Sequence, residues 1–141
     1  GPIVGPPALP EGAFRSDRRL AALVAAARRG EPLEVVRGEG RQFVAAEDVA
    51  RAVAAAIEAP DASGAYLCVD REITTWESIA RRAVELTQST SDVVIADPPP
   101  ETPAPRFDDT RLTTLLGSHL DSQAAMQRHL GHLAGATPGC R

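Results

Sequence analysis

Three groups of side chains in this sequence could do chemistry at a binding or catalytic site. The guanidinium of Arg41 has a planar fork of donors that suits a phosphate or a carboxylate. Glu47 and Asp48 follow a few residues later and Asp70 lies further on, and such carboxylates could serve as general acids or bases. Arg41 could equally form a salt bridge within the chain or at its surface, and both interpretations stay open.

Several other mechanisms are excluded because the chain has no lysine, so that all 15 positive charges are arginines. A Walker A phosphate loop, a Schiff base and a Tyr-x-x-x-Lys pair all need that lysine. The only tyrosine, Tyr66, is followed at the relevant spacing by Asp70. Gly38 and Gly40 lack the third glycine and the following helix start of a dinucleotide-binding loop, so we predict a hairpin turn there and no cofactor-binding residues.

Neither cysteine nor histidine predicts a metal centre. Cys68 lies in an apolar run and Cys140 near the C-terminus, which suggests neither a disulfide framework nor a ligand spacing. His129 and His132 are three residues apart, but no further ligand is placed on their face. We therefore expect these two histidines and His119 to face solvent.

Composition narrows the class of protein. The formal charge of −4, with acidic and basic residues interspersed, provides no basic stripe for nucleic acid. The longest apolar run, Leu20–Ala27, is far shorter than the roughly 20 residues of a membrane span. We expect a soluble, cytoplasmic protein without nucleic-acid or membrane partners.

Helical patterns and stop signals recur along the chain. Ser16 as N-cap and Gly30 as stop predict a first helix with Leu20, Leu23, Val24 and Ala27 buried. The second predicted helix begins with Glu47 and Asp48, whose charges suit a helix N-terminus, and ends at Pro60. Its predicted buried stripe is Val49, Val53, Ala56 and Ile57. A capping box at Thr74 and Glu77 opens the third, and two more are expected over Asp109–Leu116 and Asp121–Leu133.

Short strands are expected between these helices. Leu33–Val36 and Gln42–Ala45 would pair around the glycine turn, and Ala65–Val69 would be a strand covered on both faces. Asp92–Ala96 would be another strand, followed by a stiff proline-rich connector, Asp97–Pro105. These elements predict an α/β fold of short mixed strands with four to five helices.

The order and spacing of the residues from Gly38 to Asp70 resemble those of a known family. This segment reads GEGRQFVAAEDVARAVAAAIEAPDASGAYLCVD, and its GxGRxFVxxxDVAxAV…GxYxCV pattern resembles the C-terminal, substrate-binding part of the extended short-chain dehydrogenases, the NAD-dependent epimerase/dehydratase family. Gly5-Pro6 and the segment from Asp108 to Gly117 also match that family. The resemblance implies residues 1–117 as a substrate-binding-type α/β region, followed by a C-terminal helix at 118–134 and a disordered tail at 135–141.

The resemblance also implies roles for individual residues. The arginine matched by Arg41 often lines the substrate pocket of that family, and the aspartate matched by Asp48 usually fixes the start of the following helix. Gln42 stands where the family commonly has aspartate. The expected substrate-binding residues are Gly5, Pro6, Arg41, Arg106 and Arg111.

Two functions remain open at this point. The chain could be the substrate-binding portion of an NAD(P)-dependent epimerase, dehydratase or carbonyl reductase, and it would then need a Rossmann half for the cofactor and the redox chemistry. Alternatively, it could be a stand-alone truncated relative that self-associates, for example as a dimer. It would then be a binding protein or a cofactor-independent cyclase, isomerase or dehydratase that uses Glu47, Asp48 or Asp70 with Arg41. Whether this chain is itself an enzyme is left open.

Overall fold

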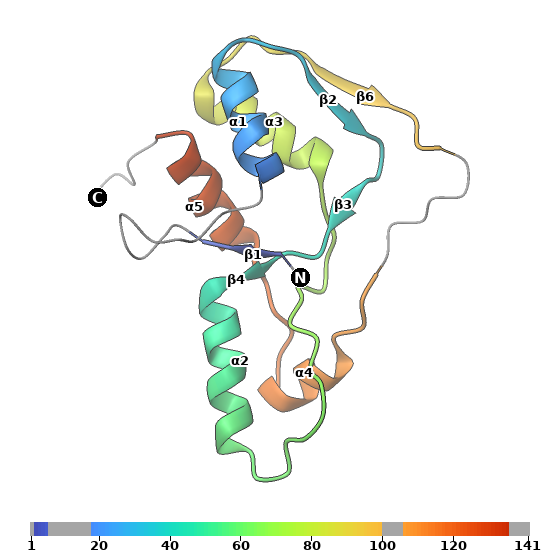
Figure 1. Ribbon diagram of the computed structural model, residues 1–141, viewed down its shortest axis with the longest axis vertical. Helices are drawn as coiled ribbons and strands as arrows, with labels where there is room; N and C mark the ends of the chain where they lie inside the picture. The colour runs from blue at the N-terminus through green and yellow to red at the C-terminus, as the bar shows by residue number, and fades with distance from the viewer. Residues whose placement is uncertain (1, 6–17, 100–105, 136–141) are drawn as a thin grey trace.

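A computed structural model describes residues 2–5, 18–99 and 106–135 of the chain. Five helices and six short strands lie in these residues (Figure 1). The helices are α1 (Arg18–Arg28), α2 (Ala46–Glu58), α3 (Trp76–Thr87), α4 (Thr110–Leu116) and α5 (Gln123–Leu133). The strands are β1 (Ile3–Val4), β2 (Leu33–Val36), β3 (Gly40–Arg41), β4 (Val44–Ala45), β5 (Thr74–Thr75) and β6 (Val93–Ala96). The expected mixed α/β class is confirmed.

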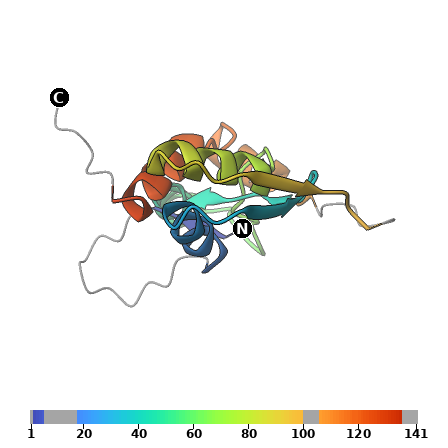
Figure 2. The ribbon, with the colours of Figure 1, turned by 90° about the horizontal axis from the view of Figure 1, so that it is seen from above.

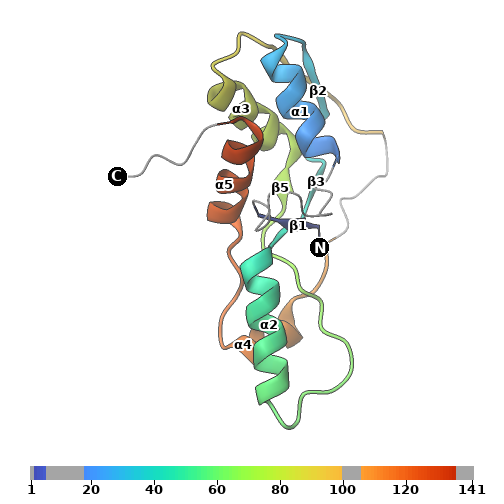
Figure 3. The same cartoon turned by 60° about the vertical axis from the view of Figure 1, so that its left-hand side comes forward.

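The larger hydrophobic core, here called the main core, lies where α1, α3 and α5 meet the strands. In Figure 3, α5 stands beside α3 while α1 closes the opposite side. The largest buried side chains are Trp76 and Phe43, whose rings meet edge to face with centroids 5.8 Å apart. The predicted inner face of α1 is confirmed, because Leu20 and Val24 are buried, and α3 buries Ile79 and Ala83 in the same core.

Strand pairing differs from the prediction. β2 pairs in parallel with β6, from Leu33 opposite Val93 to Val36 opposite Ala96, and the two strands run side by side in Figure 2. The segment expected to complete a hairpin with β2 is divided instead: β3 pairs antiparallel with β5, and β4 pairs in parallel with β1. The hairpin prediction was wrong because a local glycine turn cannot reveal partners that are distant in sequence.

Local signals mark the helix ends well. Gly30 follows α1 and Gly117 follows α4, both with the positive φ that glycine adopts readily. Glu47 and Asp48 lie in the first turn of α2, as predicted. The cap of α3 is one residue later than predicted: the hydroxyl of Thr75, not of Thr74, accepts the backbone N–H of Ser78 at 3.2 Å.

A smaller group of buried residues, here called the second core, lies between α2 and α4 at the lower end of Figure 1. Its buried members are Val44, Ala52, Leu112 and Leu120. The predicted inner stripe of α2 was wrong for two of its four residues, because Val53 is 54% and Ile57 80% exposed, whereas Val49 and Ala56 are half-buried; Ala52 is the only fully buried residue of the helix. The prediction failed for Val53 and Ile57 because no described element packs over the side of α2 that carries them.

The predicted strand Ala65–Val69 was also wrong. These residues form no strand in the described part of the chain, and Leu67 is 50% exposed although Val69 is buried. Within this segment, Tyr66 and Cys68 pack against the second core. Several predictions fall outside the described residues: the Ser16 cap, most of the proline-rich connector, and all of the predicted tail except Gly135.

Candidate functional site

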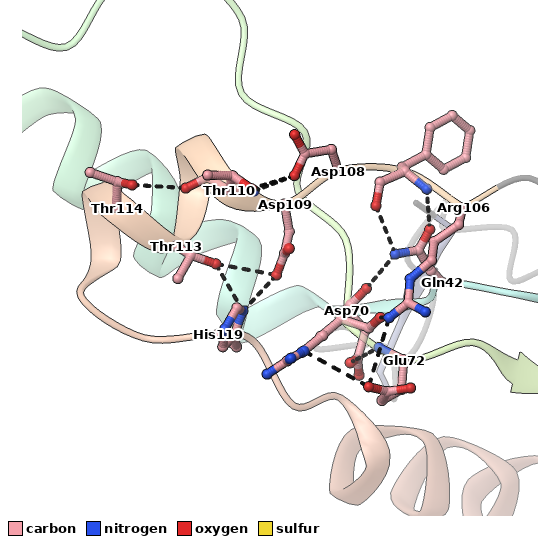
Figure 4. A network of polar contacts seen from close by, with 12 residues as sticks. Gln42, Asp70, Glu72, Arg106, Asp108, Asp109, Thr110, Thr113, Thr114 and His119 are labelled. Atoms are coloured by element: carbon pink, nitrogen blue, oxygen red, sulfur yellow. Dashed lines mark hydrogen bonds and ion pairs between the residues drawn. The ribbon is translucent and has the colours of Figure 1, made fainter.

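A buried glutamine, Gln42, joins three distant segments of the chain. Its side-chain amide nitrogen donates to the carbonyl oxygens of Asp70 (2.8 Å) and Phe107 (3.1 Å). Its amide oxygen accepts the backbone N–H of Phe107 at 2.6 Å. Figure 4 shows these bonds converging on Gln42. Since a buried amide is costly unless its hydrogen bonds are made, this arrangement holds the segment after the proline-rich stretch firmly against β3 and β4.

Asp70 forms the second buried polar centre, with 4% of its surface exposed. One carboxylate oxygen accepts the backbone N–H of Glu72 at 3.0 Å and the other accepts that of Ser122 at 2.7 Å. The hydroxyl of Ser122 in turn accepts the backbone N–H of Ala45 at 3.0 Å. Asp70 was predicted as an acid/base candidate, but both of its carboxylate oxygens accept backbone N–H groups. These bonds indicate a structural role.

Around these buried groups, the structure brings several arginines to the surface. Arg41 is adjacent to Gln42 and pairs with Thr74 across β3 and β5. Arg106 is adjacent to Phe107, and its guanidinium donates to the carbonyl of Arg71 at 3.1 Å. The guanidiniums of Arg71 and Arg106 both lie 3.9 Å from one carboxylate oxygen of Glu72. The two guanidiniums of Arg71 and Arg106 suit an anionic ligand, whereas that of Arg41 donates to the carbonyl of Gly40 at 3.3 Å.

The other carboxylate candidates lie at the start of α2. Glu47 forms an ion pair with Arg128 at 2.9 Å, and Asp48 forms one with Arg51 at 2.9 Å. Burial raises the pKa of the Asp48 carboxyl, against the opposing effect of Arg51. A raised pKa is typical of carboxyls that act as acids or bases in catalysis. Asp48, however, is paired with Arg51 of its own helix, and Glu47 is paired with Arg128 of α5.

His129 is buried, so the prediction that all three histidines face solvent was wrong for this one. Its Nδ1 lies 2.8 Å from the carbonyl oxygen of Gly5, and its Nε2 has no hydrogen-bond partner. Burial lowers the pKa of His129, and the bond to Gly5 only partly opposes this. The neutral ring therefore anchors the end of β1. Pro6, which was predicted with Gly5 to bind substrate, lies outside the described residues.

Arg111 lies apart from these groups, on α4. Its guanidinium donates to the carbonyls of Ser63 (2.7 Å) and Ala65 (3.2 Å) and stacks 4.8 Å from the centre of the Tyr66 ring. These contacts tie the loop after α2 to α4. Nearby, His119 Nδ1 lies 2.8 Å from a carboxylate oxygen of Asp109, and this contact lowers the pKa of Asp109 (Figure 4).

The glycines do not fit a dinucleotide. A Cβ placed on Gly40 would lie 2.5 Å from the carbonyl oxygen of Thr74, so the space that a pyrophosphate would need is filled by β5. Gly38 lies in the turn before β3, with no helix start behind it. Within the described ranges, no three histidine, cysteine, aspartate or glutamate side chains gather as metal ligands. No helix there is long and apolar enough to cross a membrane.

The fold is similar to part of the fold of several solved epimerases and related enzymes. The UDP-glucose 4-epimerase of Thermus thermophilus, solved with NAD, matches with a TM-score of 0.65 and 22% identity over 97% of this chain and 45% of its own. The enzyme WbmF of Bordetella bronchiseptica, solved with NAD+ and UDP, matches with a TM-score of 0.67 and 20% identity over 96% and 44%. RMD from Pseudomonas aeruginosa, solved with NADPH, matches with a TM-score of 0.64 and 16% identity over 96% and 46%.

Residues 2–68 match the sequence profile of the NAD dependent epimerase/dehydratase family. The profile and the shared fold agree with the motifs between Gly38 and Asp70, so the chain is similar to this family over the matched residues. It corresponds to less than half of the length of the solved structures that it matches. A comparison with curated proteins finds no match.

The sequence analysis missed three residues of this region: Arg71 and Glu72, which contact Arg106 or each other, and Gln42, which holds Phe107 in place. Gln42 stood out only as a departure from the family pattern, and neither Arg71 nor Glu72 was singled out. A signal for Gln42 was present, because it is a polar residue directly before the apolar run Phe43–Ala45. Its partners could not be read from the sequence, since Phe107 lies 65 residues away.

Proposed function

We propose that this chain forms the small-molecule substrate-binding portion of a longer NAD(P)-dependent epimerase, dehydratase or carbonyl reductase, and that it performs no redox chemistry alone. Arg41 and Arg106 would line the pocket, and NAD(P) would be bound by the other part of the protein. The observation that carries this proposal is the uncovered apolar side of the second core. A protein that worked alone would gain stability by covering it.

The uncovered side has two components. On α2, the exposed residues Ala46, Ala50, Val53 and Ile57 recur at helical spacing and include no charge. Beside them is a groove of about 230 Å³ lined by Val49, Ala52, Val53, Ala56, Tyr66, Cys68 and Leu112. The extended segment Ala65–Val69 adds backbone that pairs with no strand of the described residues, which is how the edge of an incomplete sheet looks.

The matched structures suggest what covers this side. Each is more than twice as long as the part that this chain aligns with. A further sheet and its helices would supply both a strand partner for Ala65–Val69 and a cover for α2. The glycine geometry around Gly40 supports a cofactor site elsewhere, because it leaves no room for a dinucleotide phosphate.

The alternative is a stand-alone truncated relative whose apolar side is covered by a second copy of itself. The same exposed stripe supports this reading, and Glu47, Asp48 and Asp70 would then be its carboxylate candidates. The engagement of all three in ion pairs or backbone hydrogen bonds makes them poor acids and bases, which favours the first proposal.

The first test is the intact mass of the endogenous protein. A mass a little over twice 14.8 kDa supports the proposal, whereas a mass near 14.8 kDa supports the stand-alone alternative. In parallel, the 141-residue chain is titrated with NAD+ and NADPH. We expect no binding, and tight binding of either cofactor would overturn the proposal.

The surface itself is tested with the double substitution Val53→Glu and Ile57→Glu. We expect the isolated chain to self-associate and bind an apolar dye through this side, and the double variant to lose both properties because charges now line the stripe. Val94→Glu is the matched control, because Val94 is also an exposed valine (47%) but lies on β6. A wild-type chain that remains monomeric and binds no dye would contradict the proposed docking side.

A further inference from the structure

A hollow of about 470 Å³ lies between the end of α2, the loop that follows it and α4, at the lower end of the molecule in Figure 1. This volume falls within the range of about 300–1,000 Å³ that is usual for small-molecule sites. Its apolar walls come from Ala59, Ala62, Tyr66 and Leu115. Neither Arg41 nor Arg106 lines it, so the hollow is separate from the expected substrate pocket.

Arg111 fixes the shape of one wall. Its guanidinium donates to the carbonyls of Ser63 and Ala65 at 2.7 and 3.2 Å, and it lies 4.8 Å from the centre of the Tyr66 ring. Between these two carbonyls, Gly64 has a φ of +73°, and a Cβ there would lie 3.2 Å from the guanidinium. The loop therefore fits closely around Arg111. A ligand would meet a wall that is already formed, which lowers the entropic cost of binding.

The hollow contains one positive and one negative group that the fold does not pair. Arg111 and Asp61 both line it, yet no ion pair joins them to each other or to another described residue. A guanidinium carries several N–H donors, and Arg111 uses only two of them on the loop carbonyls. The exposed carboxylate of Asp61 accepts no hydrogen bond from the described residues. The two carboxylates at the start of α2, by contrast, are each paired with an arginine.

These charges and walls indicate which ligand would fit. An anion would be repelled by Asp61 and a cation by Arg111, while a neutral molecule would leave both groups without a partner. A small zwitterion offers a carboxylate to Arg111 and an ammonium to Asp61, and a guanidinium can bind a carboxylate through two parallel hydrogen bonds. The apolar walls favour a ligand that also carries an apolar side chain.

We propose that this hollow is a second binding site, and that its ligand is a free α-amino acid with an apolar side chain. The carboxylate of the ligand binds Arg111, its ammonium binds Asp61, and its side chain packs against Tyr66 and Leu115. The site does not rest on the proposed substrate-binding role, because all of its walls belong to α2, α4 and the loop after α2 or to the segment that follows this loop.

The test titrates the 141-residue chain with L-phenylalanine and follows the backbone amide signals by NMR. We expect the signals of Ala62, Gly64 and Thr114 to shift with one dissociation constant, while that of Val94 on β6 stays in place. Phenylpropionate lacks the ammonium and phenethylamine lacks the carboxylate, so each should bind about threefold more weakly through the loss of one exposed charge pair. Absence of shifts at the three amides, or equal binding of all three compounds, would overturn the proposal and leave the mass and cofactor tests of the proposed function untouched.

A substitution of Asp61 sharpens the test in opposite directions. Asp61→Asn should weaken the binding of L-phenylalanine about threefold, because it removes one exposed charge pair. It should tighten the binding of phenylpropionate, because the repulsion between two carboxylates is gone, and a loss of folding could not produce this gain. Asp92→Asn is the matched control, since Asp92 is also exposed and without an ion pair among the described residues but precedes β6. An unchanged constant for L-phenylalanine in Asp61→Asn, or binding of phenylpropionate that does not tighten, would contradict the proposal.

Discussion

The main core and the second core both include helices with apolar stripes, but they differ in how much of that apolar surface is buried. In the main core, α1, α3 and α5 enclose the strands, and residues such as Leu20, Ala80 and Leu130 have almost no exposed surface. In the second core, α2 buries Ala52 alone and leaves Val53 and Ile57 exposed. The comparison shows that an apolar stripe predicts where a helix can bury surface, while the neighbouring elements decide whether it does.

The largest expected effect comes from truncating one residue in each region. Leu130→Ala in the main core should lower the free energy of unfolding by about 2–5 kcal/mol, because it removes buried contacts and leaves a cavity. Ile57→Ala in α2 should change it by less than about 0.5 kcal/mol, because that side chain is 80% exposed. Urea denaturation of both variants measures the difference, and equal losses would mean that the side of α2 is covered in solution.

The next effect concerns Gln42, which holds the segments of Asp70 and Phe107 together. Gln42→Leu keeps most of the volume but leaves the carbonyl of Asp70 and the backbone of Phe107 without their partner, which should cost about 1–3 kcal/mol. The matched control is Gln127→Leu on α5, where the glutamine is exposed and binds Arg82. Thermal unfolding should separate the two variants; identical melting temperatures would mean that the buried hydrogen bonds of Gln42 do not stabilise the fold.

Two glycines provide a comparison within the upper part of the molecule. Gly40→Ala should destabilise by about 1–3 kcal/mol, because its Cβ would lie 2.5 Å from the Thr74 carbonyl and 2.9 Å from the Thr75 Cα. Gly131→Ala should stabilise by up to about 1 kcal/mol, because it lies inside α5 with no atom within 4 Å of the new methyl group. Opposite shifts in the urea midpoint are the expected result, and a tolerated Gly40→Ala would show that β3 and β5 separate easily.

The smallest effect is the pH dependence contributed by His129. Burial holds its folded pKa below the unfolded value of about 6.5, so between the two values the unfolded chain binds more protons. The neutral ring therefore supports stability above about pH 6.5, and this contribution is lost as the pH falls toward the folded pKa.

The measurement is the free energy of unfolding from pH 8 to pH 5, compared between the wild type and two variants. His129→Asn, which keeps a donor for the Gly5 carbonyl, should flatten the slope, while His132→Asn should not, because His132 is exposed. A slope that persists in His129→Asn would assign the pH dependence to another group.

Most of the helices could be predicted, and the reason is local. Glycine stops, acidic first turns and apolar spacing act within a few residues, so α1, α3, α4 and α5 appear near their expected positions. The strand partners could not be predicted, because β1 pairs with β4 and β2 with β6 across long stretches of sequence. In addition, strands of two to four residues are too short to show a clear alternation of apolar and polar residues. Arg41 and Arg106 were predicted as substrate residues, whereas Arg71, Glu72 and Gln42 depend on the same long-range contacts.

The sequence by itself determined the family resemblance, the α/β class and the absence of lysine chemistry, because these depend on residue types and local order alone. Only the tertiary structure decided that Gln42 and Asp70 would be buried scaffolding, that His129 would be inside, and that two arginines would meet at Glu72. It also decided that one side of α2 would remain open. The physical reason is that burial and hydrogen bonding belong to pairs of segments, and a stretch of sequence specifies what it can bury but not what will cover it.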